Sequence, residues 1–358
     1  AVSAQTQSSA ITPNNSTYRL GGGGGALTVS AALNAASSSL VVRGPGSVTL
    51  SSTANSFTSA SVLPGGTLRF SASTALSSAS GRIITVASGG AVGGYALDNT
   101  FLTKLVSNTN AFVVGLGASS SNNLDFSSAT GAVLPNASLG AVAASTYSGA
   151  LTPNSSTYRL GGGGALLTVS SALADSGGAS GLVVSGTGGV TLQSSNSFTG
   201  ATTVDLNTLT LDTVSGSLAN TSSITLSNAG VLALNNTSAA NSGDRVNNSA
   251  SITVNNGGQI NFKNDAAAAT NYSETVGNLT VNSGQFYYKT TNPAAGQTND
   301  FTFSGTATVS GNGTVYFGNL TYGSGTGSRV FFNGISGTSN FLGPQYSING
   351  QFVAYGTN

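Results

Sequence analysis

The stretch SITLSNAGVLALN, which starts at Ser223, is the first of four related stretches in the second half of this 358-residue chain. SITVNNGGQINFK follows from Ser251, NLTVNSGQFYYK from Asn278 and TATVSGNGTVYFG from Thr306, so their starts are evenly spaced along the chain. Each stretch holds two runs of alternating apolar and polar residues with Gly or Asn between them. This pattern is typical of two strands joined by a turn.

A third run precedes the later stretches, because YSETV lies before NLTVN and FTFSG lies before TATVS. Three short strands in roughly 27 residues match one coil of a parallel β-helix. We therefore predict an all-β fold, a parallel β-helix (solenoid) with about three strands per coil.

Alternation with a period of two assigns each residue of a strand to one of its two faces. In the first strand of each repeat, the residues predicted to point inward are Ile224, Leu226, Ile252, Val254, Leu279, Val281, Ala307 and Val309. In the companion strand, they are Leu232, Leu234, Ile260, Phe262, Phe286, Tyr288, Val315, Phe317, Val330 and Phe332. The outward positions of the companion strand are then Ala233, Asn261, Tyr287, Tyr316 and Phe331.

A longer repeat connects two distant parts of the chain. STYRLGGGGGALTVS at Ser16–Ser30 returns as STYRLGGGGALLTVS at Ser156–Ser170. The runs LVV, VTL and NSFT follow both copies in the same order. We predict an internal duplication of residues 10–70 and 150–212, in which one supersecondary unit is repeated within a stack of coils.

The predicted organisation is one continuous β-solenoid over 1–358, with a more divergent insertion at 71–149 and regular coils of about 27–28 residues at 213–335. Within the insertion, GYALDNTFLTKLVSN places Tyr, Leu and Phe at helical spacing and offers Asp98 or Asn99 as a cap. One short helix or packed loop near residues 95–106 is expected to cover a gap in the β-helix.

The composition bounds the kind of protein. Charged residues make up only 5% of the chain and the formal net charge is +1, while 39% of residues are hydrophobic and 50 are Gly. Single, scattered Lys and Arg residues form no basic stripe, which argues against nucleic acid or anionic membrane surfaces as partners. No apolar run approaches the roughly 18 residues of a membrane-spanning helix, so membrane insertion by this segment is not expected.

Missing residue types add further expectations. The chain has no Cys and no His, which removes thiolate metal sites and the commonest general base. It also has no Met, so we expect its first residue to be a processed end or the start of a fragment, as after removal of a secretory signal. We therefore expect a secreted protein, extracellular or at the cell surface.

The stretch SFTGATTVDLNTLTLD at Ser197–Asp212 resembles the repeat of the autotransporter-associated β-strand repeat proteins, which are long secreted bacterial proteins related to autotransporter passenger domains. NSFTSASVLPGGTLRF at Asn55–Phe70 is similar to the same repeat, and GYALDNTFLTKL, NNLDFSSATG and LTPNSSTYRLGGGG resemble other segments of that family. The resemblance covers about two thirds of the chain, chiefly 10–212. It implies a right-handed parallel β-helix that is exported and displayed at the cell surface. Asn207 stands where the family's repeat usually has Gly.

The duplicated Gly runs are predicted to be structural. No GK[ST] follows them, and they lead into strand-like residues, so they do not fit a phosphate-binding loop. Gly permits positive φ and close approach to the neighbouring coil. Tyr18 with Arg19, and Tyr158 with Arg159, are expected to clamp these corners by stacking and by guanidinium hydrogen bonds to loop carbonyls.

Candidate catalytic groups are few. The chain has nine acidic residues, and Glu274 is its only Glu. Glycoside hydrolysis usually needs two carboxyl groups about 5–9 Å apart. Asp205 with Asp212, and Asp244 with Asp265, are the pairs that could approach each other, yet neither has a neighbour that would raise a pKa. We predict no catalytic residues, no cofactor and no metal site, and interpret these residues as polar groups of turns and strands.

The outward aromatic residues Tyr287, Tyr316 and Phe331 form a possible contact row, because aromatic side chains stack on sugar rings or bury against another subunit. The alternative is that the loop Thr290–Asp300 folds over them.

Together these features predict a structural extracellular protein, a β-helical building block of a bacterial surface fibre, stalk or layer that associates with itself. An adhesin or carbohydrate-binding passenger domain that contacts surface polysaccharide is the alternative, and a β-helical polysaccharide-degrading enzyme is a third, weaker one.

Overall fold

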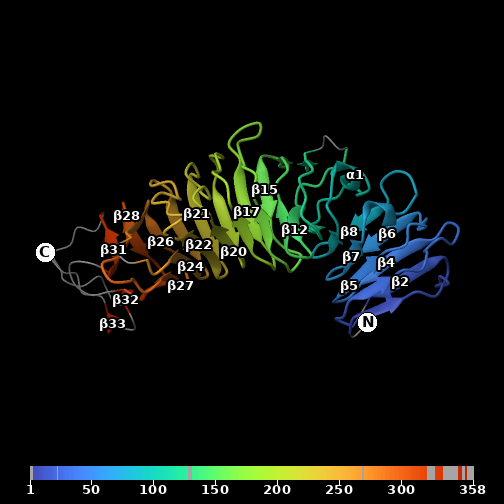
Figure 1. Cartoon of the computed structure of the whole chain (residues 1–358), viewed down its shortest axis with the longest axis horizontal. Helices are drawn as coiled ribbons and strands as arrows, with labels where there is room; N and C mark the ends of the chain where they lie inside the picture. The colour runs from blue at the N-terminus through green and yellow to red at the C-terminus, as the bar shows by residue number, and fades with distance from the viewer. Residues whose placement is uncertain are drawn as a thin grey trace. The chain divides into compact units, whose positions relative to one another are not determined.

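Parallel strand pairing dominates the computed structural model of this chain, which describes residues 3–21, 23–127, 131–267, 270–320, 327–333, 346–348 and 351–352. The chain is an all-β parallel β-solenoid of about 12 turns in which helix accounts for 2% of residues, so the predicted fold class is confirmed. It divides into two compact units, Ala1–Ser171 and Ala172–Asn358. Within each unit, successive strands stack in chain order (Figure 1).

In the first unit, the longest ladder runs β1-β3-β5-β7-β9-β10-β12-β15. These strands are Gln5–Gln7, Leu27–Val29, Ser47–Leu50, Thr67–Phe70, Ala91–Gly93, Val113–Leu116, Ser138–Ala141 and Thr157–Leu160. A second ladder, β2-β4-β6-β8, comprises Thr17–Gly21, Ser39–Arg43, Ser59–Val62 and Ile84–Val86. Two further pairs are β13 (Ser145–Tyr147) with β16 (Leu167–Val169), and β11 (Leu124–Asp125) with β14 (Leu151–Thr152).

In the second unit, one ladder runs β17-β19-β21-β23-β26-β29, at Gly181–Ser185, Thr202–Asp205, Ser223–Ser227, Ser251–Asn255, Leu279–Val281 and Ala307–Val309. The companion ladder runs β18-β20-β22-β24-β27-β30-β32-β33. Its strands are Val190–Leu192, Thr208–Leu211, Gly230–Asn236, Gly258–Asn264, Gln285–Thr290, Thr314–Gly318, Tyr346–Ile348 and Gln351–Phe352. A third ladder is β25-β28-β31, at Tyr272–Val276, Thr298–Phe303 and Gly327–Phe332.

The sequence spacing of the repeats is the length of one coil. Ile224 pairs with Ile252, Ile252 with Leu279, and Leu279 with Ala307, so each repeat found in the sequence lies directly on the previous one. Coils just before this region are shorter, because Leu182 already pairs with Thr202. The predicted register of the repeats is therefore confirmed for this ladder.

The number of strands per coil varies. YSETV and FTFSG form β25 and β28, which pair with each other in parallel as the third strands of their coils. Most of the earlier coils have two strands, with turns and bends on the remaining side. The prediction of three strands per coil thus holds where the coils are longest.

Inward-facing residues form a continuous apolar core. All of those predicted in β21, β22, β23, β24, β26, β27 and β30 are buried. Ala307 and Val309 of β29 are half-buried while Thr308 between them is exposed, so their direction is also as predicted. Ala233 lies between Leu232 and Leu234 and so on the outward face, as predicted, but it is only 2% exposed and offers no open surface.

The prediction that Val330 and Phe332 belong to the companion strand is wrong. These residues lie in β31, which pairs with β28 and not with the companion strand β30. Val330 pairs with Phe301 and Phe332 with Phe303, and the rings of Phe303 and Phe332 stack with centroids 4.9 Å apart. The run extends the third ladder because its aromatic side chains continue the aromatic stack of that side.

The predicted short helix is present as α1 (Asn99–Leu102), and a 3-10 turn, η1, lies at Ser73–Ala75. The Asp98 carboxylate caps α1 by accepting a hydrogen bond from the Phe101 N–H at 3.0 Å. Phe101 is fully buried and packs edge-on against Phe70, with centroids 6.4 Å apart. The segment thus covers the core of the first unit, as expected.

The two copies of the duplicated motif occupy different sides of the coil. In the first copy TYRL lies in β2, in the second ladder, and LTV lies in β3, in the longest ladder. In the second copy TYRL lies in β15, in the longest ladder, and LTV lies in β16, which pairs with β13. The second copy of the module therefore begins one side further along the coil than the first copy.

Buried Asn residues connect successive coils. The Asn55 side chain accepts a hydrogen bond from the Leu33 N–H at 3.0 Å and donates to the Ala75 carbonyl at 2.9 Å. Asn196, its counterpart in the second copy of NSFT, accepts from the Leu173 N–H at 3.0 Å and donates to the Ser217 carbonyl at 2.9 Å. Each amide thereby satisfies backbone groups of the coil before and the coil after its own.

Variants at two neighbouring glycines of the second copy can show why the duplicated motif needs a Gly run. Gly163 and Gly164 have φ values of 83° and 86°, but only a Cβ on Gly163 would meet another residue, 2.5 Å from the Ala141 carbonyl oxygen. We expect Gly164→Ala to lower the free energy of unfolding by about 1 kcal/mol, the cost of left-handed backbone. Gly163→Ala should cost at least about 2 kcal/mol, because the coils must also separate. Urea denaturation compares the two variants, and equal losses would contradict the close-approach role.

Candidate functional site

Tyr287 and Tyr316 form an aromatic pair on the outer face of the companion ladder. They are directly paired residues of β27 and β30, both half-buried. Their ring centroids lie 5.1 Å apart with an interplanar angle of 66°, an edge-to-face contact. Such a pair offers an apolar ring face and phenolic hydroxyls at one place.

Gly318 makes room for this pair. A Cβ on Gly318 would lie 3.0 Å from both the Cε2 atom and the hydroxyl oxygen of Tyr287, and 3.3 Å from Cε1 of Tyr316. The ring of Tyr287 therefore reaches across to the next coil and lies against the backbone of β30. A residue with a side chain at position 318 would displace the ring.

Phe331 does not belong to this pair, so the predicted row of three aromatic residues is wrong at its last member. Phe331 lies in β31, where it pairs with Thr302 of β28. It is 40% exposed, and the Arg329 guanidinium lies over its ring at 5.3 Å. Arg329 also forms an ion pair with Asp300 at 2.7 Å.

Amide and ammonium groups surround the tyrosine pair. Gln259 of β24 pairs with Tyr287, and Asn261 of the same strand pairs with Lys289. Lys263 and Lys289 are exposed, and they follow Asn261 and Tyr287 on the same outward face of their strands. The face formed by Gln259, Asn261, Lys263, Tyr287, Lys289 and Tyr316 is called the Tyr–Lys face below.

The loop between β27 and β28, which was the alternative cover for the aromatic residues, bonds to other parts of the coil. The Thr291 hydroxyl accepts from the Asn264 N–H at 3.0 Å. Gln297 donates to the Asp265 carbonyl at 2.8 Å. These contacts hold the loop against the end of β24, and both tyrosines remain half-exposed.

The first predicted corner is only partly as expected. Tyr18 is buried and its hydroxyl accepts a hydrogen bond from the Ala35 N–H at 3.0 Å, whereas Arg19 is exposed. Arg19 donates to the carbonyls of Asn14, at 3.1 Å, and Thr17, at 3.4 Å, as predicted. Stacking of Tyr18 on Arg19 was wrong, because neighbouring strand residues point to opposite faces.

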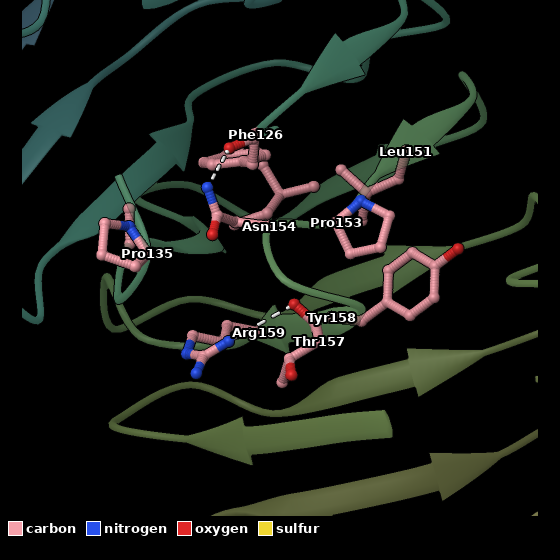
Figure 2. A pocket seen from close by; sticks show the side chains of 10 residues that line it. Phe126, Pro135, Leu151, Pro153, Asn154, Thr157, Tyr158 and Arg159 are labelled. Atoms are coloured by element: carbon pink, nitrogen blue, oxygen red, sulfur yellow. Dashed lines mark hydrogen bonds between the residues drawn. The ribbon is translucent and has the colours of Figure 1, made fainter. Parts of the chain in front are cut away.

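The second corner repeats this arrangement. Figure 2 shows Tyr158 and Arg159 extending from β15 in different directions, with Arg159 donating to the Thr157 carbonyl at 3.4 Å. Burial lowers the pKa of the Arg159 guanidinium. A hollow of about 10 Å³ beside these residues is at the lower limit for one water molecule, so it offers no ligand site.

The residues before each TYRL strand explain why the motif is duplicated as a block. Asn15 and Ser16 have φ values of 48° and 55°, and Ser155 and Ser156 have values of 50°. In both copies the Thr N–H bonds back to the Asn that opens the turn, at 3.0 Å. Two consecutive residues with positive φ are typical of a type I′ turn, whose carbonyls the Arg side chain then binds.

The acidic pairs considered for catalysis are held by separate partners. Asp205 lies in β19 and accepts from Asn228 at 2.6 Å, whereas Asp212 follows β20 in the other ladder and accepts from Asn235 at 2.6 Å. Asp265 accepts from the Ser238 N–H at 2.7 Å and from the Tyr272 hydroxyl. These carboxylates hold turns and neighbouring coils together.

A buried arginine in the second unit was not predicted from the sequence. The side chain of Arg245 is fully buried, and its Nε donates to the Asn236 side chain at 2.6 Å. Its two Nη atoms donate to the carbonyls of Gly216, at 2.6 Å, Asn235, at 3.0 Å, and Ala240, at 3.2 Å. The guanidinium thus serves as the hydrogen-bond donor for an inner corner of the stacked coils.

Glu274 lies beside this arginine and is 1% exposed. Its carboxylate accepts from the N–H groups of Arg245, at 2.9 Å, and Val246, at 3.2 Å. Burial raises the pKa of Glu274 to about 8, and the two N–H donors oppose this shift because they favour the ionised form. The only Glu of the chain is therefore a buried structural group.

Among the residues that the structure describes, no group of three or more His, Cys, Asp and Glu could hold a metal ion. No helix in this part of the chain is long and apolar enough to cross a membrane. Comparisons with protein-family models, with curated proteins and with solved structures found no match to this chain.

Proposed function

We propose that this chain is a structural part of an extracellular bacterial surface protein, of the autotransporter-associated β-strand repeat type, that builds a fibre, stalk or layer and catalyses no reaction. The observation that carries the proposal is the coil-to-coil register. Strand stacks directly on strand, and Asn55 and Asn196 each bond to both adjacent coils. Side chains that bond one coil to the next suit a solenoid with a structural role.

Self-association would use the edge of β1 that faces away from β3. In the described residues β1 pairs on one side only, with β3. The Gln5 N–H donates to Ala26 at 2.9 Å and the Gln7 carbonyl accepts from Ser30 at 3.0 Å. Because parallel strands use alternate residues for each neighbour, the N–H and carbonyl of Thr6 point away from β3. A strand of a second copy would pair there.

A proline at position 6 tests this edge. We expect electron microscopy of the protein as isolated, without refolding, to show continuous fibres for the original chain and for Thr6→Val. Thr6→Pro should give discrete particles, because it removes only an N–H that points away from β3. Discrete particles from all three proteins would refute self-association, and fibres from all three would refute the β1 edge as its site.

Carbohydrate binding is the second candidate function, and the half-exposed pair of Tyr287 and Tyr316 favours it. A glycan screen should detect binding that is lost in the double variant Tyr287→Ser with Tyr316→Ser, while the circular dichroism of the two proteins stays the same. Retained binding in the double variant would exclude this face.

A further inference from the structure

The Tyr–Lys face collects an unusual share of the chain's positive side chains. The whole sequence has three Lys residues, and two of them, Lys263 and Lys289, lie on this face. Lys289 pairs with Gly318 on one side and with Asn261 on the other, and Lys263 is two positions beyond Asn261 on the same strand. From the strand spacing and the rise per residue, their Cα atoms lie about 8 Å apart.

Carboxylates are absent from the same surface. The outward positions of β22, β24, β27 and β30 are Val231, Ala233, Asn235, Gln259, Asn261, Lys263, Gln285, Tyr287, Lys289, Thr314, Tyr316 and Gly318. Two acids lie just beyond these strands: Asp265, two positions after Lys263, accepts from the Ser238 N–H and the Tyr272 hydroxyl, and Asp212 accepts from Asn235. Lys263 and Lys289 are therefore the charged residues at the outward positions of these four strands, although the chain as a whole carries a net charge of only +1.

We propose that the Tyr–Lys face binds an acidic polysaccharide of the uronate class. One sugar ring stacks on the exposed ring face of the tyrosine pair, and the carboxylates of neighbouring uronates meet the ammonium groups of Lys263 and Lys289. Gln259 and Asn261 supply amides for the hydroxyl groups. This inference rests on carbohydrate binding as a function of the chain and adds the chemical class of the glycan.

The geometry favours an acidic over a neutral glycan. A neutral chain would use the tyrosines but leave both ammonium groups, which face outward beside the rings, without a counter-charge. The flat row of paired positions, Gln259 with Tyr287 and Tyr287 with Tyr316, runs from coil to coil and suits an extended polymer. Because Gly318 has no side chain, no atom at that position projects beside the Tyr287 ring, and a sugar ring can approach Tyr287 from that side.

The test compares one polymer in two charge states. Polygalacturonate and its fully methyl-esterified form have the same sugar backbone, and only the first carries carboxylates. We expect calorimetry to show binding of polygalacturonate that weakens with added salt, and at least tenfold weaker binding of the ester. The double variant Lys263→Gln with Lys289→Gln should lose at least tenfold in affinity for polygalacturonate.

The matched control is Arg19→Gln with Arg43→Gln, which removes the same charge from exposed residues of β2 and β4. This control should bind as the original protein does. Equal binding of the ester and the acid would overturn the uronate assignment while leaving carbohydrate binding intact. Unchanged affinity in the lysine variant would overturn the site, and no binding of either polymer would remove both the inference and the function on which it rests.

Discussion

Replacing Arg245 with Met is expected to lower the free energy of unfolding by about 3–5 kcal/mol. Met keeps the length of the side chain but removes four hydrogen-bond donations. The carbonyls of Gly216, Asn235 and Ala240 belong to the backbone, so no compensating substitution can remove them. Buried acceptors that lose their partners each cost about 1–3 kcal/mol.

One further variant at position 245 separates charge from hydrogen-bond geometry, and a variant at position 329 serves as the control. Arg245→Lys keeps the positive charge but loses the planar arrangement of donors, and should cost nearly as much as Met. Arg329→Met removes a partly exposed arginine whose ion pair with Asp300 is 30% and 26% exposed, and should cost less than about 1 kcal/mol. Chemical denaturation measures all three. A loss for Arg245→Met as small as that for Arg329→Met would contradict the structural role.

Residue alternation predicted most of the core of the second unit, for a definite physical reason. A strand of a β-helix has one buried and one solvated face, so Ile252 and Val254 must be apolar and Thr253 need not be. Because each coil rests on the last, the regular spacing of the repeats also predicted that Ile252 would lie on Ile224 and under Leu279.

The same reasoning failed at β31, because alternation does not say which side of a coil a strand occupies. Val330 and Phe332 alternate as Val315 and Phe317 do, yet they continue the stack of Phe301 and Phe303. Phe331 was misplaced with them. Val330 lies one coil length after Phe301 of FTFSG, and this spacing is the signal that places β31 in the third ladder.

Arg245 had no signal in the sequence that could have placed it in the interior. Its acceptors are backbone carbonyls, which every sequence contains, and Asn236, one of many Asn residues. Glu274 is 29 residues further along the chain than Arg245, and it lies nearby only because the coils stack, so that its carboxylate accepts from the Arg245 N–H. The two tyrosines of the Tyr–Lys face were predicted to face outward from the sequence. The lysines were not assigned to this face, because their place beside the tyrosines follows from the register of β24 on β27.

Stability is expected to fall as pH rises from about 4.5 to about 8, with Glu274 as the main cause. In the folded protein the pKa of Glu274 is raised to about 8 by burial, against an ordinary value of 4.5. Between these pH values the folded state therefore holds a proton that the unfolded state has released. Since the unfolded state binds fewer protons, the free energy of unfolding decreases with pH in this range.

The size of the effect follows from the shift in pKa. Each unit of pKa difference corresponds to about 1.4 kcal/mol, so the loss across the window reaches up to about 5 kcal/mol. Below about pH 4.5 the contribution is complete, and above about pH 8 it is gone. Few other groups obscure it, because the chain has no His and no second Glu, and the shifted carboxyls Asp175, Asp212 and Asp265 have lowered pKa values.

The slope of stability against pH, and not its absolute value, tests the assignment. Glu274→Gln cannot ionise, so its free energy of unfolding should change little between pH 5 and pH 8, whereas the original protein should lose several kcal/mol. The variant will be less stable at pH 5, because the hydroxyl oxygen of protonated Glu274 can still accept a hydrogen bond, whereas the NH2 of Gln cannot accept from the N–H of Arg245 or Val246. Denaturation at four pH values for each protein measures both slopes. Parallel slopes would show that Glu274 ionises near its ordinary pKa, held there by those two N–H donors in spite of its burial.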